Sequence, residues 1–299
     1  MRLPRFDYKA PATVEEACRL LEQFDKNALV MAGGTDLLLR LKQGLVKPSI
    51  IIGLKKIKGL GLIRFDEKTG LTIGASALLA EVASHTDVLK HYPAVAYAAN
   101  ETANVQIRNM GTVAGNLCNG SPSADNAPSL MAADAEVTLV SSKGERIVPL
   151  AEFFKGPGLT ELRDGEIMSS ILIPPPPPGS GTDYQHISAR GKVDISAVGV
   201  AVMLIMDGLV CRRASIVLGA VAPNPIHALE AENFILGKNL TPFQIEKAAI
   251  TASKEARPIS DIRATAGYRR KMVKVLTMRA LLRAKQRAIK KTEAKGDRP

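Results

Sequence analysis

The sequence is poor in several residue types, and each shortage narrows the functions open to it. It has no tryptophan and only three cysteines, Cys18, Cys118 and Cys211, in 299 residues. These cysteines are far apart and form no C-x-x-C pair, so we expect no zinc or iron–sulfur site in this chain. The longest apolar run, "AVGVAVMLIM" from Ala197 to Met206, falls well short of the roughly 20 residues that a membrane helix requires. We therefore expect no membrane span.

The two ends of the chain carry further compositional signals. The N-terminal segment, "MRLPRFDYKAPATVEEA", lacks the apolar core and cleavage site of a secretory signal, and we expect a cytoplasmic protein. At the other end, Arg269 to Pro299 contains 12 lysines or arginines and two acidic residues, which leaves 28 basic and 27 acidic residues elsewhere. The net charge of +11 therefore belongs to one C-terminal segment, and the nearly neutral body argues against a nucleic-acid partner.

Hydrophobic patterning predicts mixed helices and strands in the first half of the chain. Thr13 opens "TVEEACRLLEQF" and Glu16 follows three residues later, which is the capping-box signature of a helix start. The short apolar runs in "ALVMAGG" and "PSIIIGL" predict buried strands. "PAVAYAANETAN" predicts a helix and "VQIRNMGTVAGN" a loop, because glycine and asparagine disfavour helix. "SADNAPSLMAADA" predicts a short helix capped by Ser123 or Asp125.

Five consecutive prolines, Pro174 to Pro178, mark the clearest boundary in the sequence. Such a run favours the polyproline II conformation and acts as a semi-rigid spacer. The strands predicted after it precede helices, which is the order of an α+β domain. We expect a first domain over 1–175, in two lobes of approximately 1–55 and 56–175. A C-terminal domain over 176–285 and a basic, frayed tail over 286–299 complete the expected organisation.

Two glycine-containing loops are the candidate ligand site. Gly33 and Gly34 end an apolar run in "LVMAGGTDLLLRLKQG", where a helical pattern begins. Glycine lets the main chain approach a ligand closely, and the first turn of a helix offers unpaired amides that suit a phosphate. The loop fits neither common nucleotide fingerprint. A second loop, which includes Gly111 and Gly115, adds hydroxyl and amide side chains, and two such loops in one domain suit the diphosphate of a dinucleotide.

The two loops resemble those of the FAD-binding medium subunits of molybdenum hydroxylases, a family that includes xanthine dehydrogenase and carbon monoxide dehydrogenase. The likeness rests on "AGGTDLL" from Ala32 to Leu38 and on "QIRNMGTVAGNLCNGSPSADNAPSLMAADAEV" from Gln106 to Val137. It extends to "FDYKAPATVEEA" near the start and to "GKVDISAVGVAVML" after the prolines. The resemblance implies an α+β fold, in which a two-lobed FAD-binding domain of the vanillyl-alcohol-oxidase type precedes a C-terminal α+β domain. It also implies FAD as the cofactor.

The same resemblance implies a set of FAD-binding residues. Asp125 matches an acidic position near the flavin, Ile167 or Met168 matches an apolar contact, and His186 falls where some relatives place a lysine. The pyrophosphate is expected between the two loops. The loop residues implied to bind the cofactor are Ala32, Gly33, Gly34, Thr35, Asp36, Leu37, Gly111, Thr112, Gly115, Asn116 and Ser121.

The resemblance implies an FAD-carrying electron-transfer subunit of a multi-subunit molybdenum hydroxylase. It would accept electrons from a small [2Fe–2S] subunit, stand beside a large molybdenum-cofactor subunit in a dimer of heterotrimers, and pass electrons to NAD or a quinone-like acceptor. No side chain of this chain is then required as a nucleophile or general base. Two alternatives stay open: a self-sufficient FAD-dependent oxidoreductase on the same fold, and a non-catalytic nucleotide- or nucleic-acid-binding module.

Overall fold

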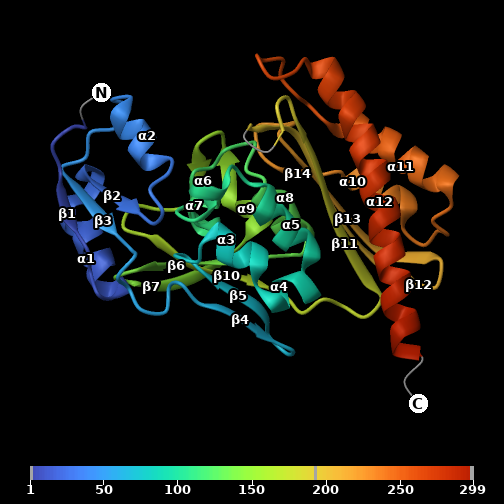
Figure 1. Cartoon of the computed structure of the whole chain (residues 1–299), viewed down its shortest axis with the longest axis horizontal. Coiled ribbons are helices and arrows are strands. Elements are labelled where there is room, and N and C mark those ends of the chain that lie inside the picture. The colour runs from blue at the N-terminus through green and yellow to red at the C-terminus, as the bar shows by residue number, and fades with distance from the viewer. Residues whose placement is uncertain (1–2, 192–193, 297–299) are drawn as a thin grey trace.

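The computed structural model describes residues 3–191 and 194–296. Its three parts follow one another in chain order across the long axis of the molecule (Figure 1). An N-terminal lobe lies at one end, a central lobe in the middle, and a C-terminal domain at the other end. The prediction of mixed helices and strands with an α+β C-terminal unit is confirmed.

The N-terminal lobe is a three-stranded parallel sheet in the order β1-β3-β2 with a helix on it. Its helix α1 starts as the sequence predicts, because Thr13 Oγ1 accepts a hydrogen bond from the amide of Glu16 at 3.1 Å. The Glu16 carboxylate accepts the return bond from the amide of Ala12, one residue earlier than a standard capping box would have it. The elements are β1 (Asp7–Lys9), α1 (Val14–Phe24), a 3₁₀ turn (Asp25–Asn27), β2 (Ala28–Met31), α2 (Leu37–Lys42) and β3 (Ile50–Gly53).

The central lobe is a five-stranded antiparallel sheet with short helices beside it, and the sheet order is β4-β5-β10-β6-β7. Strand β10, at the end of the first domain, is the central strand and pairs with the earlier strands β5 and β6. The strands of this sheet are β4 (Ile63–Asp66), β5 (Gly70–Gly74), β6 (Glu136–Ser141), β7 (Gly144–Pro149) and β10 (Ile167–Ile173), and β8 (Phe154–Gly156) with β9 (Leu159–Thr160) forms a separate two-stranded sheet. The helices are α3 (Leu79–Ser84), α4 (Thr86–His91), α5 (Pro93–Glu101), α6 (Val105–Arg108), α7 (Val113–Cys118), α8 (Asn126–Ala132) and α9 (Leu150–Phe153).

The prediction of a loop for "VQIRNMGTVAGN" is wrong, because the segment forms the short helices α6 and α7. Side-chain caps account for the difference. Asn104 Oδ1 accepts from the amide of Ile107, and Thr112 Oγ1 accepts from the amide of Gly115, each at 2.9 Å. Such caps satisfy backbone donors at a helix start and outweigh the low helix propensity of glycine over one or two turns.

The capping prediction for α8 is also wrong. The helix begins directly after Asp125, but no side chain caps its first turn. The Asp125 carboxylate instead accepts hydrogen bonds from Ser196 Oγ at 2.6 Å and from the Tyr184 hydroxyl at 2.9 Å, both from the C-terminal domain. These partners lie 71 and 59 residues away in the sequence, so no local pattern predicts the contacts.

The C-terminal domain is a four-stranded antiparallel sheet followed by three helices. Strand β12 is almost entirely buried, because both of its faces are covered. Val198, Val200 and Leu204 point to the core shared with the C-terminal helices, whereas Ala201 and Met203 point to the core of the central lobe. The elements are β11 (Ser180–Ser188), β12 (Ser196–Asp207), β13 (Val210–Gly219), β14 (Ile226–His227), α10 (Leu229–Ile235), α11 (Pro242–Glu255) and α12 (Ala266–Gly296).

Helix α12 runs along the outer face of this sheet to the C-terminal end of the molecule (Figure 1). The sequence predicts a frayed tail from residue 286, and the structure corrects this prediction. The helix continues to Gly296, and Ala288 is fully buried. Arg287 also donates to the carboxylate of Asp183 at 2.7 Å, which fixes this turn of the helix to β11. In the part of the chain that the structure describes, no helix is long and apolar enough to cross a membrane.

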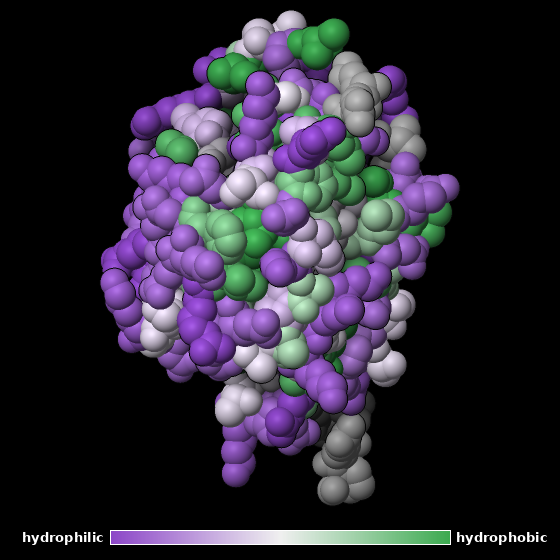
Figure 2. Space-filling view, turned by 90° about the vertical axis from the view of Figure 1, so that its left-hand side faces the viewer, coloured by the Kyte–Doolittle hydropathy of each residue, from purple (hydrophilic) through white to green (hydrophobic). Residues whose placement is uncertain are grey.

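The end of the molecule formed by the N-terminal lobe is largely hydrophilic, with a group of hydrophobic side chains near its centre (Figure 2). Large apolar side chains exposed in this lobe are Leu3, Tyr8, Leu39 and Leu45. Isolated apolar residues are normal on a surface, whereas a contiguous group is typical of a contact with another protein.

Glycine at position 181 permits the close packing of α12 on β11. A Cβ atom there would lie 2.0 Å from the carbonyl oxygen of Ala284, and backbone cannot yield as a flexible side chain can. We expect Gly181→Ala to lower the free energy of unfolding by about 1–3 kcal/mol, as overpacking does elsewhere. Urea denaturation measures the change, with Gly61→Ala as control because nothing lies within 4 Å of its Cβ position. Equal stabilities of the two variants would contradict this account of the packing.

Candidate flavin-binding cleft

The two glycine loops meet directly. A Cβ atom on Gly33 would lie 2.1 Å from the carbonyl oxygen of Met110, so the backbones of the two loops are in contact at this point. Gly111 lies next to the first loop as well, because its Cβ position is 3.5 Å from Thr35 Oγ1. The N-terminal and central lobes are thus joined where the sequence predicts a bound pyrophosphate.

Each loop presents backbone amides that the following helix leaves without an acceptor. The first helical bond of α2 runs from the amide of Leu38 to Gly34, so the amides of residues 35–37 precede the helical ladder. In α7 the first such bond runs from Asn116 to Thr112, and residues 113 and 114 precede it. Gly34 has a φ of 74°, a left-handed conformation that glycine adopts without strain.

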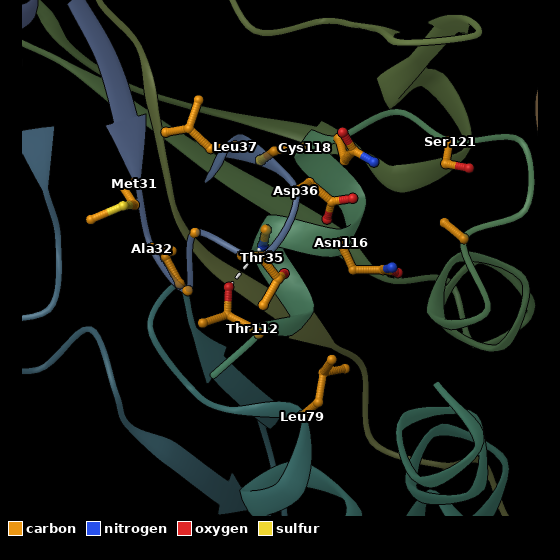
Figure 3. A pocket seen from close by; sticks show the side chains of 18 of the residues that line it. Met31, Ala32, Thr35, Asp36, Leu37, Leu79, Thr112, Asn116, Cys118 and Ser121 are labelled. Atoms are coloured by element: carbon orange, nitrogen blue, oxygen red, sulfur yellow. Dashed lines mark hydrogen bonds between the residues drawn. The ribbon is translucent and has the colours of Figure 1, made fainter. Parts of the chain in front are cut away.

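Between the loops lies a cavity of about 480 Å³, within the range of roughly 300–1,000 Å³ that small-molecule sites occupy. All of the predicted cofactor-binding residues line this cavity except His186. Thr35 and Thr112 lie close together across the two loops, and the Thr112 hydroxyl bonds to the start of its own helix (Figure 3). We refer to this cavity as the cleft.

Several residues that line the cleft were not among the sequence predictions. Met31, Leu79, Cys118 and Leu162 add apolar surface, and Arg40 adds a cation. Only Arg40 has a signal in the sequence, since it lies one helical turn after Asp36 and therefore on the same face of α2. Burial raises the pKa of the Cys118 thiol to about 12, which keeps this side chain neutral and unreactive.

The carboxylates of the cleft differ in their partners. Burial raises the pKa of Asp36, and the nearby Arg40 opposes the shift. Burial also raises the pKa of Asp125, against its hydrogen bonds from Ser196 and Tyr184. Glu166 accepts from Arg146 at 2.7 Å and so adds no unbalanced charge to the lining of the cleft.

His186 stands behind the wall of the cleft. Its Nδ1 lies 3.1 Å from Ser196 Oγ, and its Nε2 lies 3.3 Å from the Glu101 carboxylate. Hydrogen bonds connect it to the cleft through Ser196 and Asp125. Among the described residues, no group of histidine, cysteine and acidic side chains is arranged to hold a metal ion.

The geometry of the cleft fits a dinucleotide. Gly115 lines the cleft, and a Cβ atom there would meet only Thr112 Oγ1, at 2.9 Å, so any longer side chain would enter space that a ligand needs. Asn126 Nδ2 donates to Asn116 Oδ1 at 3.0 Å and fixes the orientation of the Asn116 amide. The lining of the cleft combines polar loops with the buried apolar side chains of Ile167 and Met168. Such a lining suits a ligand that has a charged and an apolar portion.

Comparison with known proteins agrees with this geometry. The family described as "FAD binding domain in molybdopterin dehydrogenase" matches residues 4–176, and "CO dehydrogenase flavoprotein C-terminal domain" matches residues 183–284. The fold and the cleft together therefore define an FAD-binding flavoprotein with two domains.

Relatives are similar over nearly their whole length. The chain is 34% identical to the carbon monoxide dehydrogenase medium chain of Afipia carboxidovorans, covering 95% of this chain and 98% of that one. It is 30% identical to the xanthine dehydrogenase FAD-binding subunit of Escherichia coli O157:H7, covering 93% and 95%. The solved structure of carbon monoxide dehydrogenase from Hydrogenophaga pseudoflava superposes with a TM-score of 0.92 at 34% identity, covering 96% and 99%. The chain belongs to the family of FAD-binding medium subunits of molybdenum hydroxylases, which are oxidoreductase subunits.

A methyl group at Gly33 tests the contact between the loops. Because Gly33→Ala places a Cβ against the Met110 carbonyl, the loops must separate, and we expect at least about a tenfold loss of FAD affinity with a smaller loss of stability. Flavin fluorescence titration of the apoprotein measures this loss. Gly61→Ala serves again as the control, and unchanged affinity in Gly33→Ala would mean that the loop contact does not shape the site.

The raised pKa of Asp125 predicts a pH-dependent contribution to stability. The folded chain holds this proton more tightly than the unfolded chain, so the contribution is present below the unfolded pKa of about 3.9 and is lost as pH rises through the folded pKa. Asn cannot ionise, and Asn Oδ1 can accept from Ser196 and Tyr184. We therefore expect the stability of Asp125→Asn, relative to the parent, to increase from about pH 4 to pH 7.

Urea denaturation across this pH range checks the prediction. The exposed Asp164→Asn provides a control for the loss of one surface carboxylate. A stability difference between Asp125→Asn and the parent that does not change with pH would contradict the assignment.

Proposed function

We propose that the cleft binds FAD without a covalent bond and that the chain is the electron-transfer subunit of a multi-subunit molybdenum hydroxylase. The meeting of two glycine loops from different lobes at one cavity is the observation that carries this proposal. Family membership supports it, because the relatives named above are a medium chain and an FAD-binding subunit. FAD supplies the redox chemistry when bound, and the protein supplies binding and orientation.

In this proposal the free amides of the two loops hold the pyrophosphate. Thr35 and Thr112 donate hydroxyl hydrogen bonds, and Arg40 balances part of the phosphate charge. Ile167 and Met168, which line the cleft with Asp125, would supply the apolar contact to the flavin ring. The remaining predicted residues, Ala32, Gly33, Gly34, Asp36, Leu37, Gly111, Gly115, Asn116 and Ser121, shape the cradle and line it. His186 has a different position, behind the cleft wall.

The proposed partners are a small [2Fe–2S] subunit and a large molybdenum-cofactor subunit, as a dimer of heterotrimers. The iron–sulfur subunit delivers electrons to the flavin, and NAD or a quinone-like molecule removes them. The exposed apolar side chains of the N-terminal lobe are suited to a subunit contact. We propose that the FAD-binding domain covers residues 1–175, in lobes of about 1–55 and 56–175, and that the C-terminal domain begins at residue 176.

Native purification and anaerobic reduction test this function. The chain isolated from its own source under gentle conditions should carry one FAD, released intact by acid, together with iron and molybdenum on other chains. The FAD of the separated chain should stay oxidised with small organic substrates, whereas the assembled complex should be reduced by one of them. A chain that is free of iron and molybdenum and is reduced directly by a substrate would instead be a self-sufficient oxidoreductase.

A further inference from the structure

A chain of hydrogen bonds leads from the cleft into the interface between the central lobe and the C-terminal domain. Asp125 Oδ1, on the cleft, accepts from Ser196 Oγ at 2.6 Å. Ser196 Oγ lies 3.1 Å from His186 Nδ1, and His186 Nε2 lies 3.3 Å from Glu101 Oε2. Four side chains, from the residue before α8 and from β12, β11 and α5, are therefore connected by successive hydrogen bonds.

The far end of this chain lies beside a second cavity. Glu101 Oε1 accepts from Asn100 Nδ2 at 3.2 Å, and Asn100 lines a cavity of about 340 Å³ between the two domains. Tyr97, Asp183, Arg283 and Arg287 line the same cavity. The rest of the lining is largely apolar, and the polar and charged part is suited to water that exchanges protons with solvent.

The hydrogen bonds are compatible with a proton on Asp125. Asp125 Oδ1 accepts from the Ser196 hydroxyl, so a proton on this carboxyl lies on Oδ2. In this arrangement Ser196 accepts from His186 Nδ1, and His186 Nε2 faces Glu101 as an acceptor. An imidazole ring can take up a proton at one nitrogen and release one from the other. His186 can thus receive a proton from the side of Glu101 and pass one on towards Ser196.

The chain is shielded from bulk water along its length. Ser196 is 2% exposed, and the side chains of His186 and Glu101 are 13% and 7% exposed. The Tyr184 ring stacks on the His186 imidazole at a centroid distance of 5.9 Å, and Tyr97 stands edge-on to both rings. Among the described residues, Glu101, Tyr97 and Tyr184 are ionisable groups that face His186 or Asp125.

An electron supplied by an iron–sulfur partner brings no proton with it, yet a flavin that accepts a hydride equivalent gains two electrons and one proton. We propose that Asp125, Ser196, His186 and Glu101 form a proton relay that connects the second cavity to the cleft, an inference that rests on the proposed function. In each reduction Asp125 gives one proton to the cleft. Ser196 then replaces it with its own and takes one from His186, which takes a proton from Glu101. The Glu101 carboxylate, whose side chain is 7% exposed, takes its replacement proton from water beside the second cavity, since the Asn100 amide does not carry protons. The net change is one proton moved from water to the cleft.

Reduction of the FAD-loaded chain by reduced methyl viologen tests the relay, because each viologen gives one electron and no proton. In a weakly buffered anaerobic solution, flavin absorbance follows the electrons and a pH-indicator dye follows proton uptake. Ser196→Ala breaks the relay, and His186→Gln keeps hydrogen-bonding groups but cannot carry a proton. In both variants we expect proton uptake to slow by at least about tenfold, while FAD affinity stays near that of the parent.

Two matched variants separate a relay from a structural role. Ser215→Ala removes another buried serine hydroxyl of the same sheet, and His227→Gln removes a histidine that pairs with Glu232 in the C-terminal domain. Both should take up protons at the parent rate. Parent-like uptake in Ser196→Ala, or equal slowing in Ser215→Ala, would overturn the relay alone. A parent chain that binds no FAD would overturn the proposed function and the relay together.

Discussion

The contact between Gly33 and the carbonyl oxygen of Met110 is the constraint on which the cleft depends. The two residues belong to different lobes with separate sheets, and any side chain at position 33 would separate them. The contact sets the distance between two groups of backbone amides, each at the start of a short helix. Neither loop alone would define a site for a diphosphate. Their joint position does so with main-chain atoms, whose location follows from the fold rather than from side-chain rotamers.

The C-terminal domain completes this arrangement from the opposite side. Tyr184 and Ser196 come from its sheet, and both hold the Asp125 carboxylate at the cleft. Leaving such a buried carboxylate without donors would cost free energy, so the docked sheet and the ordered carboxylate stabilise each other. The domain is therefore part of the site even though the loops that form the cradle lie outside it.

Local signals predicted much of the fold and the site. The capping residues of α1, the apolar runs of the strands and the two glycine loops are all short-range patterns, and the cleft residues followed from the loops and the family resemblance. The helices α6 and α7 were missed because caps at Asn104 and Thr112, rather than helix propensity, decide them. The partners of Asp125 and the place of His186 arise from contacts between domains, which a single sequence does not encode in any local pattern.

Strand β12 has a further consequence for the way the chain can be divided. Its alternating side chains contribute to two hydrophobic cores, one in the central lobe and one in the C-terminal domain. The five consecutive prolines would suggest dividing the chain between these domains. A fragment that began after the prolines would expose the apolar face formed by residues such as Ala201 and Met203, and such faces drive aggregation. The proline run thus separates the two domains in the sequence, but we do not expect the C-terminal domain to be stable when it is expressed alone. A shift of one residue within β12 would likewise exchange the two faces, so this strand should tolerate insertions and deletions less than any surface loop.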